Sequence, residues 1–264
     1  MMDYSAYTLI HTERQGRLLR LSLANPPMNV ISFDLHRQLS RIFYDIQLDS
    51  SVDVVSLTGQ GDVFSAGGDI PLMQKRIDDE ELCYPKNSEL KQIVFSLLEL
   101  DRPVVCAING DCVGFGLTLA LLCDITVVAN DARLGDPHVR VGYSTGDGSS
   151  IIWPQLIGYH RAKQFLLTGD LFSGADAASF GLVNHAVPRT EVQQKADYYI
   201  NRFLNGASRA VRWSKLSINL PLRVLAQSHL DASLAYQTLT NRSRDHQEAV
   251  DAFHEKRKPK FTGQ

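Results

Sequence analysis

Residues 64–70, FSAGGDI, place two adjacent glycines between an apolar segment and a helical pattern. The segment NGDCVGFG at residues 109–116 has three glycines in a similar position after a strand-like run. Glycine permits a positive φ and the close approach of a ligand, and the first N–H groups of a helix have no partner within that helix. Both segments therefore predict backbone N–H groups that face a cleft at strand ends and hold an anion. Neither has the pattern of a P-loop or of a dinucleotide fingerprint.

The runs around these segments predict the fold class. Val52–Thr58, Pro103–Asn109 and Cys123–Ala129 are short and rich in Val, Ile and Cys, which is typical of buried strands. A helical pattern, Ser88–Leu100, separates the first two strands. This alternation of strand and helix indicates an α/β protein.

The two ends of the chain differ in character. Near the N-terminus, Tyr7–Thr12 and Arg17–Leu23 predict a hairpin, and Ser32 is placed to cap the helix that follows. The last quarter instead contains successive helical patterns without a strand-like run, namely Thr190–Leu204, Ser208–Leu220, Val224–Thr240 and Arg242–Lys256. We therefore expect an α/β core with the active site at residues 1–190 and a helical region at residues 191–264. Periodicity leaves open whether that region packs on its own core or on another subunit.

The bulk composition excludes several classes of partner. A formal net charge of −2 over 264 residues offers no basic footprint for nucleic acid or for an anionic membrane. No apolar run approaches the roughly 20 residues that span a bilayer, and the N-terminus lacks a signal-peptide pattern. We expect a cytoplasmic protein that acts on a small molecule. Its four cysteines form no C-x-x-C pair and are expected to be buried thiols.

Several segments, taken in order, resemble the crotonase (enoyl-CoA hydratase/isomerase) superfamily. FSAGGDI is similar to its F-x-A-G-A-D-[IL] segment, and PVVCAING at residues 103–110 is similar to its P-V-I-A-A-[IV]-N-G strand. Further matches are CDI at 123–125, LTG at 167–169, the stretch 175–184 and KPKFTG at 258–263. The resemblance runs from about residue 20 to the C-terminus. It implies a crotonase-like spiral of ββα units with a C-terminal helical region used for oligomerisation, giving a homotrimer or homohexamer.

The resemblance also implies the chemistry. Its substrates are mostly acyl-CoA thioesters, so coenzyme A enters as part of the substrate and no cofactor is bound permanently. The N–H groups of Gly68 and Phe115 would hold the thioester oxygen as it becomes an enolate, and removing one such donor costs roughly 3–4 kcal/mol of barrier. The family usually has glycine where Phe115 stands. Ala66, Asp69 and Ile70 are expected to contact the substrate.

Two positions depart from the typical hydratase. The glutamates that flank the substrate double bond fall at Thr118 and His138, so the usual water-activating pair is absent, and Thr118 is kept as a substrate contact. The chain instead has Asp136-Pro137-His138 followed by Gly146-Asp147-Gly148. An imidazole with a pKa near 6.5 suits a general base, and a carboxylate on its other nitrogen fixes the tautomer. We therefore predict His138 and Asp147 as the catalytic pair. Asp136 is a weaker candidate that can instead form a turn before the proline.

Three functions remain open from the sequence. The first is an enzyme of the hydratase/isomerase family, a lyase or isomerase, that uses an acyl-CoA thioester. The second is a β-diketone hydrolase that cleaves a C–C bond without CoA, because the same His/Asp spacing resembles the branch that includes 6-oxocamphor hydrolase. The third is a non-catalytic CoA-binding scaffold, which the His/Asp pair disfavours.

Other polar residues carry less information. The seven remaining histidines lack the spacing of a metal site, so no metal is expected. Tyr143 and Ser144 offer hydroxyl groups near His138, although hydroxyls in such a loop are more often turn partners.

Overall fold

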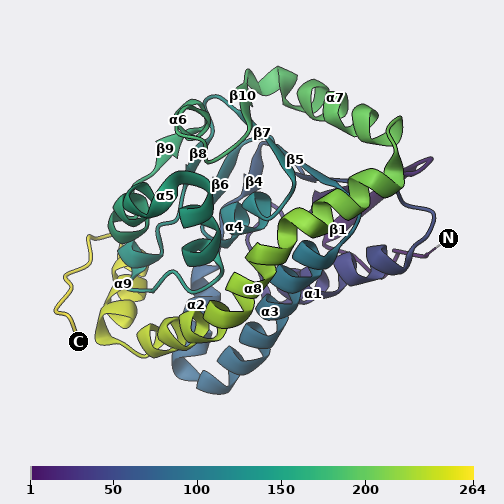
Figure 1. Cartoon of the computed structure of the whole chain (residues 1–264). Coiled ribbons are helices and arrows are strands. Elements are labelled where there is room, and N and C mark those ends of the chain that lie inside the picture. Colours follow the sequence, from purple (N-terminus) through teal and green to yellow (C-terminus); the bar gives the residue numbers. More distant parts are fainter. Residues whose placement is uncertain (1) are drawn as a thin grey trace.

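Among residues 2–264, which the computed structural model describes, the chain forms two β-sheets surrounded by helices (Figure 1). The larger sheet has the strand order β1-β2-β3-β5-β7-β10, and the smaller one has the order β4-β6-β8-β9. The strands are β1 (Ile10–Gln15), β2 (Leu18–Leu23), β3 (Val54–Gly59), β4 (Val63–Ser65), β5 (Val104–Ile108), β6 (Asp111–Val113), β7 (Ile125–Ala129), β8 (Arg133–Gly135), β9 (Phe172–Ser173) and β10 (His185–Val187). The α-helices are α1 (Phe33–Leu48), α2 (Ile70–Asp78), α3 (Cys83–Glu99), α4 (Phe115–Leu121), α5 (Ser149–Thr168), α6 (Gly174–Ser179), α7 (Val192–Leu204), α8 (Ser208–Asn241) and α9 (Arg244–His254). The 3₁₀ helices are η1 (Glu80–Leu82), η2 (His138–Val141) and η3 (Arg189–Glu191).

A ββα unit repeats through the core. β3, β4 and α2 form one turn of the spiral, β5, β6 and α4 the next, and β7, β8 and α5 a third. In each turn the first strand joins the larger sheet and the second joins the smaller one, and neighbouring turns pair in parallel. The α/β class and the spiral of ββα units are thus confirmed. The short second strands had no sequence prediction of their own, because three residues carry too little periodicity.

The N-terminal hairpin and the capped helix are also confirmed. β1 and β2 pair antiparallel on either side of Gly16, whose φ of +61° makes the turn. The Ser32 hydroxyl accepts a hydrogen bond from Leu35 N at 3.3 Å and so caps α1. The apolar stripe of α1, which includes Leu39 and Phe43, is fully buried. The four cysteines are buried and free.

The structure joins two of the predicted C-terminal helices. Ser208–Leu220 and Val224–Thr240 form one helix, α8, which continues through Pro221, so the predicted interruption is wrong. A proline inside a helix costs about 3 kcal/mol. Packing along α3 offsets that cost, because Leu230 and Leu234 are buried there. Figure 1 shows α8 as a long helix that crosses over α3.

The C-terminal helices lie close to the core. α7 packs against β3, β5 and β7, and α9 packs against α2 and η2, the segment that begins with His138. The division of the chain at residue 190 into an α/β core and a helical region stays a prediction. The first helix after that point, α7, packs on the larger sheet of the core. In the part of the chain that the structure describes, no helix combines the length and the apolar character needed to cross a bilayer.

Candidate active site

The two glycine-bearing segments lie against each other at Gly67 and Gly114. Both residues have positive φ, +79° and +56°. A Cβ atom added to Gly67 would lie 2.8 Å from the carbonyl oxygen of Val113 and 3.7 Å from the Cα atom of Gly114. A side chain at Gly67 would therefore push the two segments apart, so their contact requires glycine there.

Gly68 and Phe115, the predicted oxyanion donors, follow these glycines and line one cavity. Phe115 is the first residue of α4, where N–H groups have no partner within the helix. Gly68 forms an isolated parallel bridge with Ile31, in which Ile31 N donates to Gly67 O at 2.8 Å and the N–H of Gly68 is not used. Within residues 2–264, neither predicted donor gives its N–H to a backbone acceptor outside regular helices and strands.

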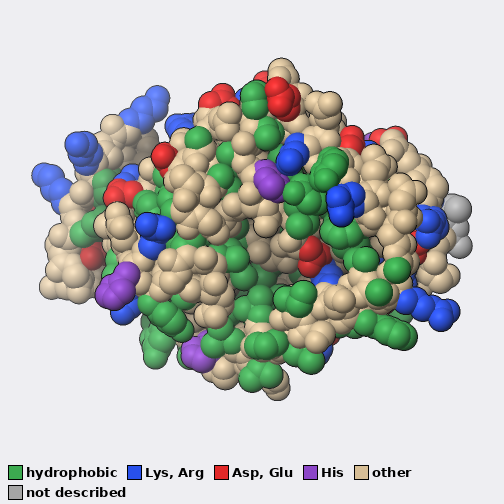
Figure 2. Space-filling view, turned by 45° about the horizontal axis from the view of Figure 1, so that its top comes forward, with side chains coloured by type: hydrophobic (Ala, Val, Ile, Leu, Met, Phe, Trp, Pro, Cys, Tyr) green, Lys and Arg blue, Asp and Glu red, His purple; other side chains and the backbone are tan. Residues whose placement is uncertain are grey.

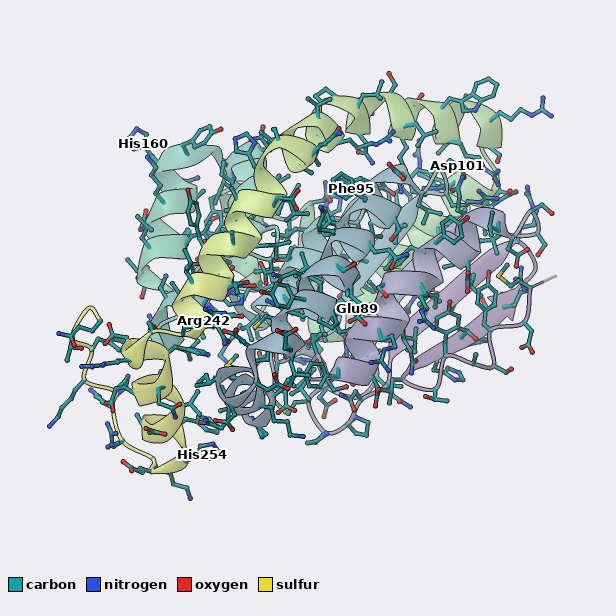
Figure 3. The ribbon with its side chains drawn as sticks, turned by 90° about the horizontal axis from the view of Figure 1, so that it is seen from below. Glu89, Phe95, Asp101, His160, Arg242 and His254 are labelled. Atoms are coloured by element: carbon teal, nitrogen blue, oxygen red, sulfur yellow. The ribbon has the colours of Figure 1, made fainter. Side chains whose placement is uncertain are left out.

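The phenyl group of Phe115 forms part of the cavity wall. Its side chain is buried, and its ring centroid lies 5.6 Å from that of His36 on α1. The ring of His36 in turn bonds through Nδ1 to Glu89 Oε2 at 2.7 Å. Figure 3 shows Glu89 on α3 beside α1. The departure from glycine at position 115 is thus accommodated by packing between α4 and α1.

The cavity brings together half of the predicted site residues. Gly68, Phe115, His138 and Asp147 line it, together with Ile31, His36, Met73, Arg76, Lys86, Leu90, Tyr143 and Gln237. Its volume is about 40 Å³, which holds ordered water but not an acyl chain. Binding of a larger substrate therefore requires the walls to move.

Both ring nitrogens of His138 face a carboxylate. Nδ1 contacts Oδ1 of Asp136, which also accepts the backbone N–H of His138 at 3.2 Å. Nε2 lies 3.5 Å from Oδ2 of Asp147. Asp136, the weaker candidate from sequence, is therefore the direct partner of His138, because its side chain reaches two residues forward along the same turn. The structure also places Asp147, the partner predicted from the sequence, beside His138.

The two carboxylates decide the charge of His138. Burial alone lowers its pKa, but the charges of Asp136 and Asp147 outweigh burial and raise the pKa of His138 to about 9. Burial opposes ionisation of Asp136 too, yet His138 holds the pKa of Asp136 below its usual value. Burial dominates at Asp147 and raises its pKa. At neutral pH the geometry therefore favours an imidazolium, which lacks the free lone pair of a base, beside an Asp147 carboxyl whose pKa is shifted toward neutrality.

Asp147 is positioned by its neighbours. Its Oδ1 atom accepts hydrogen bonds from Thr118 Oγ1 at 3.3 Å and from Ser149 N at 3.4 Å, while Oδ2 points toward His138. Close packing explains the flanking glycines, because a Cβ on Gly146 would lie 2.5 Å from the backbone of α8, and Gly148 has φ +105°.

The remaining predicted substrate contacts are placed differently. Thr118 is fully buried and bonds Asp147 instead of lining the cavity. Ala66, Asp69 and Ile70 lie in the segment around Gly68 but do not line the cavity, and Asp69 is the N-cap residue of α2. Their contact with a substrate stays a prediction.

Two buried basic residues line the cavity and were not among the predicted site residues. Arg76 on α2 and Lys86 on α3 are 9% and 8% exposed. Lys86 Nζ contacts Gln237 Oε1 and donates to the Tyr143 hydroxyl at 3.4 Å. Burial, reinforced by the charge of Arg76, lowers the pKa of Lys86 to about 7. Each cation lies on the buried face of its helix, since Arg76 stands four residues after Leu72 and Lys86 four residues before Leu90.

One group in the described chain has metal-ligand atoms close together. Ligand atoms of Asp136, His138 and Asp147 lie within 4.8 Å of one another, although no metal was expected. Each nitrogen of His138 already faces a carboxylate, and an imidazolium offers no lone pair to a metal. The arrangement therefore fits an ion-paired histidine. Figure 3 shows His160 and His254 at the periphery, on α5 and α9.

The chain resembles known proteins along nearly its whole length. A family model described as enoyl-CoA hydratase/isomerase matches residues 13–264. A crotonyl-CoA hydratase of Syntrophomonas wolfei is 32% identical over 263 residues, covering 97% of this chain and 98% of that protein. A short-chain-enoyl-CoA hydratase of Clostridium acetobutylicum is 32% identical over 253 residues, covering 93% and 94%. The crystal structure of an enoyl-CoA hydratase/isomerase from Mycobacterium paratuberculosis superimposes with a TM-score of 0.89 at 31% identity, covering 92% of this chain and 98% of that one.

Proposed function

The chain belongs to the enoyl-CoA hydratase/isomerase family, and on that premise we propose that it moves protons on the acyl group of a CoA thioester with Asp147 and His138. The observation that carries the proposal is that these two side chains meet at 3.5 Å on the wall of the cavity that Gly68 and Phe115 also line. Family relatives named as hydratases support an acyl-CoA substrate, with coenzyme A as part of that substrate.

The backbone donors stabilise the transition state. A thioester oxygen held by the N–H groups of Gly68 and Phe115 gains negative charge as an enolate forms. Donors fixed by the fold bind that developing charge more strongly than the neutral thioester, which lowers the barrier. The phenyl group of Phe115 leaves the N–H in place.

The carboxyl of Asp147 is the proton carrier in this proposal. Its ionised form takes a proton from the acyl carbon or from water, because its raised pKa makes it a stronger base than an exposed aspartate. The imidazolium of His138, held by Asp136, stabilises the carboxylate and returns a proton to the product. The same pair serves hydration of a double bond or its migration.

Solvent exchange tests this assignment directly. The purified protein is incubated in D₂O with butyryl-CoA, and deuterium at the carbon next to the thioester is measured by mass spectrometry. Crotonyl-CoA and 3-enoyl-CoA assays then separate hydration from isomerisation by the loss or gain of the conjugated chromophore. Exchange that survives in Asp147→Asn would contradict the assigned proton carrier. Cleavage of cyclic β-diketones without any thioester chemistry would favour the C–C hydrolase, and thioester binding without exchange would favour the scaffold.

We further propose that α8 joins copies of the chain into a homotrimer or homohexamer. Large apolar side chains of α8 are exposed in the single chain, among them Trp213, Ile218, Val224 and Leu239. Figure 2 shows hydrophobic side chains exposed across the middle and lower part of one face. Burial of such surface between copies would stabilise an assembly. A cytoplasmic location stays a prediction.

A further inference from the structure

Arg76 and Lys86 place two basic side chains on the wall of one cavity. Both side chains are more than nine-tenths buried, and they come from different helices, α2 and α3. Within residues 2–264, neither forms an ion pair with an Asp or Glu side chain. Burying an unpaired cation is costly, so two of them in one small cavity require a reason.

The contacts of the two cations are with neutral groups. Lys86 Nζ meets the oxygens of Tyr143 and Gln237, and the guanidinium carbon of Arg76 lies 5.1 Å from the ring centroid of Phe33. The Nε atom of Arg76 is buried and has no acceptor in the described chain. The Arg76 charge helps to lower the pKa of Lys86 to about 7, as expected for cations that lie near each other.

The nearby carboxylates are engaged elsewhere. Asp147 accepts from Thr118 and Ser149 and faces His138. Glu89, on α3 with Lys86, pairs with His36 at 2.7 Å and with Arg37 at 3.5 Å. Asp147 acts on Lys86, and Glu89 and Asp69 act on Arg76, only at longer range than an ion pair. Within residues 2–264 no carboxylate contacts the cationic wall, by which we mean Arg76 and Lys86, and an anion from a ligand would supply that contact.

We propose that Arg76 and Lys86 form a carboxylate subsite, and that the substrate is a short acyl-CoA whose acyl group ends in a second carboxylate. The inference rests on the proposed function, which places the acyl group in this cavity. A guanidinium binds a carboxylate through two parallel hydrogen bonds, and an ammonium adds a point charge. The hydroxyl of Tyr143 lies beside Lys86 and offers a further donor.

The cationic wall and the reacting groups line the same small cavity, so the second carboxylate would lie only a few carbon atoms from the thioester. The cationic wall, the backbone donors of Gly68 and Phe115, and the His138–Asp147 pair all line a space of about 40 Å³. An acyl group with its thioester oxygen at the donors and its far carboxylate at Arg76 and Lys86 is therefore compact.

Binding of saturated thioesters tests the subsite without any turnover. Isothermal titration calorimetry compares adipyl-CoA with hexanoyl-CoA, and glutaryl-CoA with pentanoyl-CoA, so each pair differs only by the terminal carboxylate. We expect the carboxylated member to bind about ten- to a hundredfold more tightly to the wild type. Arg76→Met and Lys86→Met should each reduce that ratio to about two, because the methyl-terminated member needs neither cation.

The control is Lys75→Met, which removes the same charge from an exposed position of α2 and should leave the ratio unchanged. Arg76→Lys should keep part of the preference, and thermal unfolding shows which variants are folded. Equal affinity for both members in the wild type would overturn the subsite. So would a preference that survives both methionine variants, or an equal loss for both members. Failure of every thioester to bind would overturn the proposed acyl-CoA function together with this inference.

Discussion

The Nε2 atom of His138 lies 3.5 Å from Oδ2 of Asp147, while the opposite nitrogen of the same ring contacts Asp136. The histidine is thus held as a cation between two carboxylates of unequal character. Asp136 is stabilised as an anion, whereas burial favours the protonated form of Asp147. Proton transfer is therefore expected to centre on Asp147, with His138 as its charged partner.

Asp147→Asn should abolish most proton exchange, because the amide has the shape of the carboxyl but no basic oxygen. General base catalysis typically contributes 10²–10⁴-fold, so we expect a fall of about that size in the rate of deuterium incorporation. Mass spectrometry of butyryl-CoA in D₂O measures it. Asp170→Asn, at an exposed site, is the control and should exchange at the wild-type rate. A fall of less than threefold in the rate of deuterium incorporation by Asp147→Asn would show that another group carries the proton.

Asp136→Asn should lower the pKa of His138 from about 9, because the charge of Asp136 is the largest of the influences that raise it. NMR titration of the His138 ring protons measures the change. We expect a fall of at least one pH unit. A pKa that stays near 9 in the variant would show that Asp147 alone charges the ring.

Ionisation of His138 also predicts how stability depends on pH. Its pKa is higher in the folded state, at about 9, than in the unfolded chain, at about 6.5. The proton it binds therefore stabilises the fold fully below about pH 6.5, and this contribution is lost as the pH rises to about 9. The loss is on the order of 3 kcal/mol. Urea unfolding of wild type and His138→Gln between pH 6 and 10 measures it, and parallel curves for the two proteins would contradict the prediction.

Phe115→Pro should remove the second oxyanion donor with little harm to α4. Proline lacks an N–H group and is accepted at the first position of a helix, which Phe115 occupies. Phe115→Ala is the matched control, since it loses the same ring but keeps the N–H. We expect kcat of the proline variant to fall about 10²–10³-fold below that of the alanine variant. If the folded proline and alanine variants had equal kcat values, the N–H group of Phe115 would not be an oxyanion donor.

Gly67→Ala should be more harmful than Gly61→Ala. Both glycines have nearly the same positive φ, +79° and +78°, so the backbone strain of alanine is matched. Only at Gly67 would the added Cβ meet a backbone oxygen, at 2.8 Å, whereas Gly61 has open space. We expect Gly67→Ala to cost about 1–3 kcal/mol more in the free energy of unfolding and to lower kcat. Urea unfolding and the exchange assay measure the two effects, and equal behaviour of the variants would exclude a role for this contact.

Local pattern predicted much of the architecture. The strands before the two glycine segments, the cap at Ser32 and the alternation of strands and helices all depend on residues near each other in sequence. The interruption placed before Val224 was wrong, because the packing of α8 along α3 overrides the local effect of Pro221. The sequence did not predict the strands β4, β6 and β8, because each has only three residues, too few to show a periodicity.

The sequence by itself determined the family, the alternation of strand and helix, and the two segments that carry Gly68 and Phe115, because short motifs and the positions of glycine specify these features. Tertiary structure decided the charges of the site. Lys86 meets Gln237 across 151 residues of sequence, and Thr118 meets Asp147 across 29. Burial and the distance to other charges set the pKa of a side chain, and both arise only when distant segments pack together. For that reason the cavity that Arg76 and Lys86 share with His138 and Asp147 became visible only in the folded chain, whereas Asp136, two residues before His138, was already a candidate from the sequence.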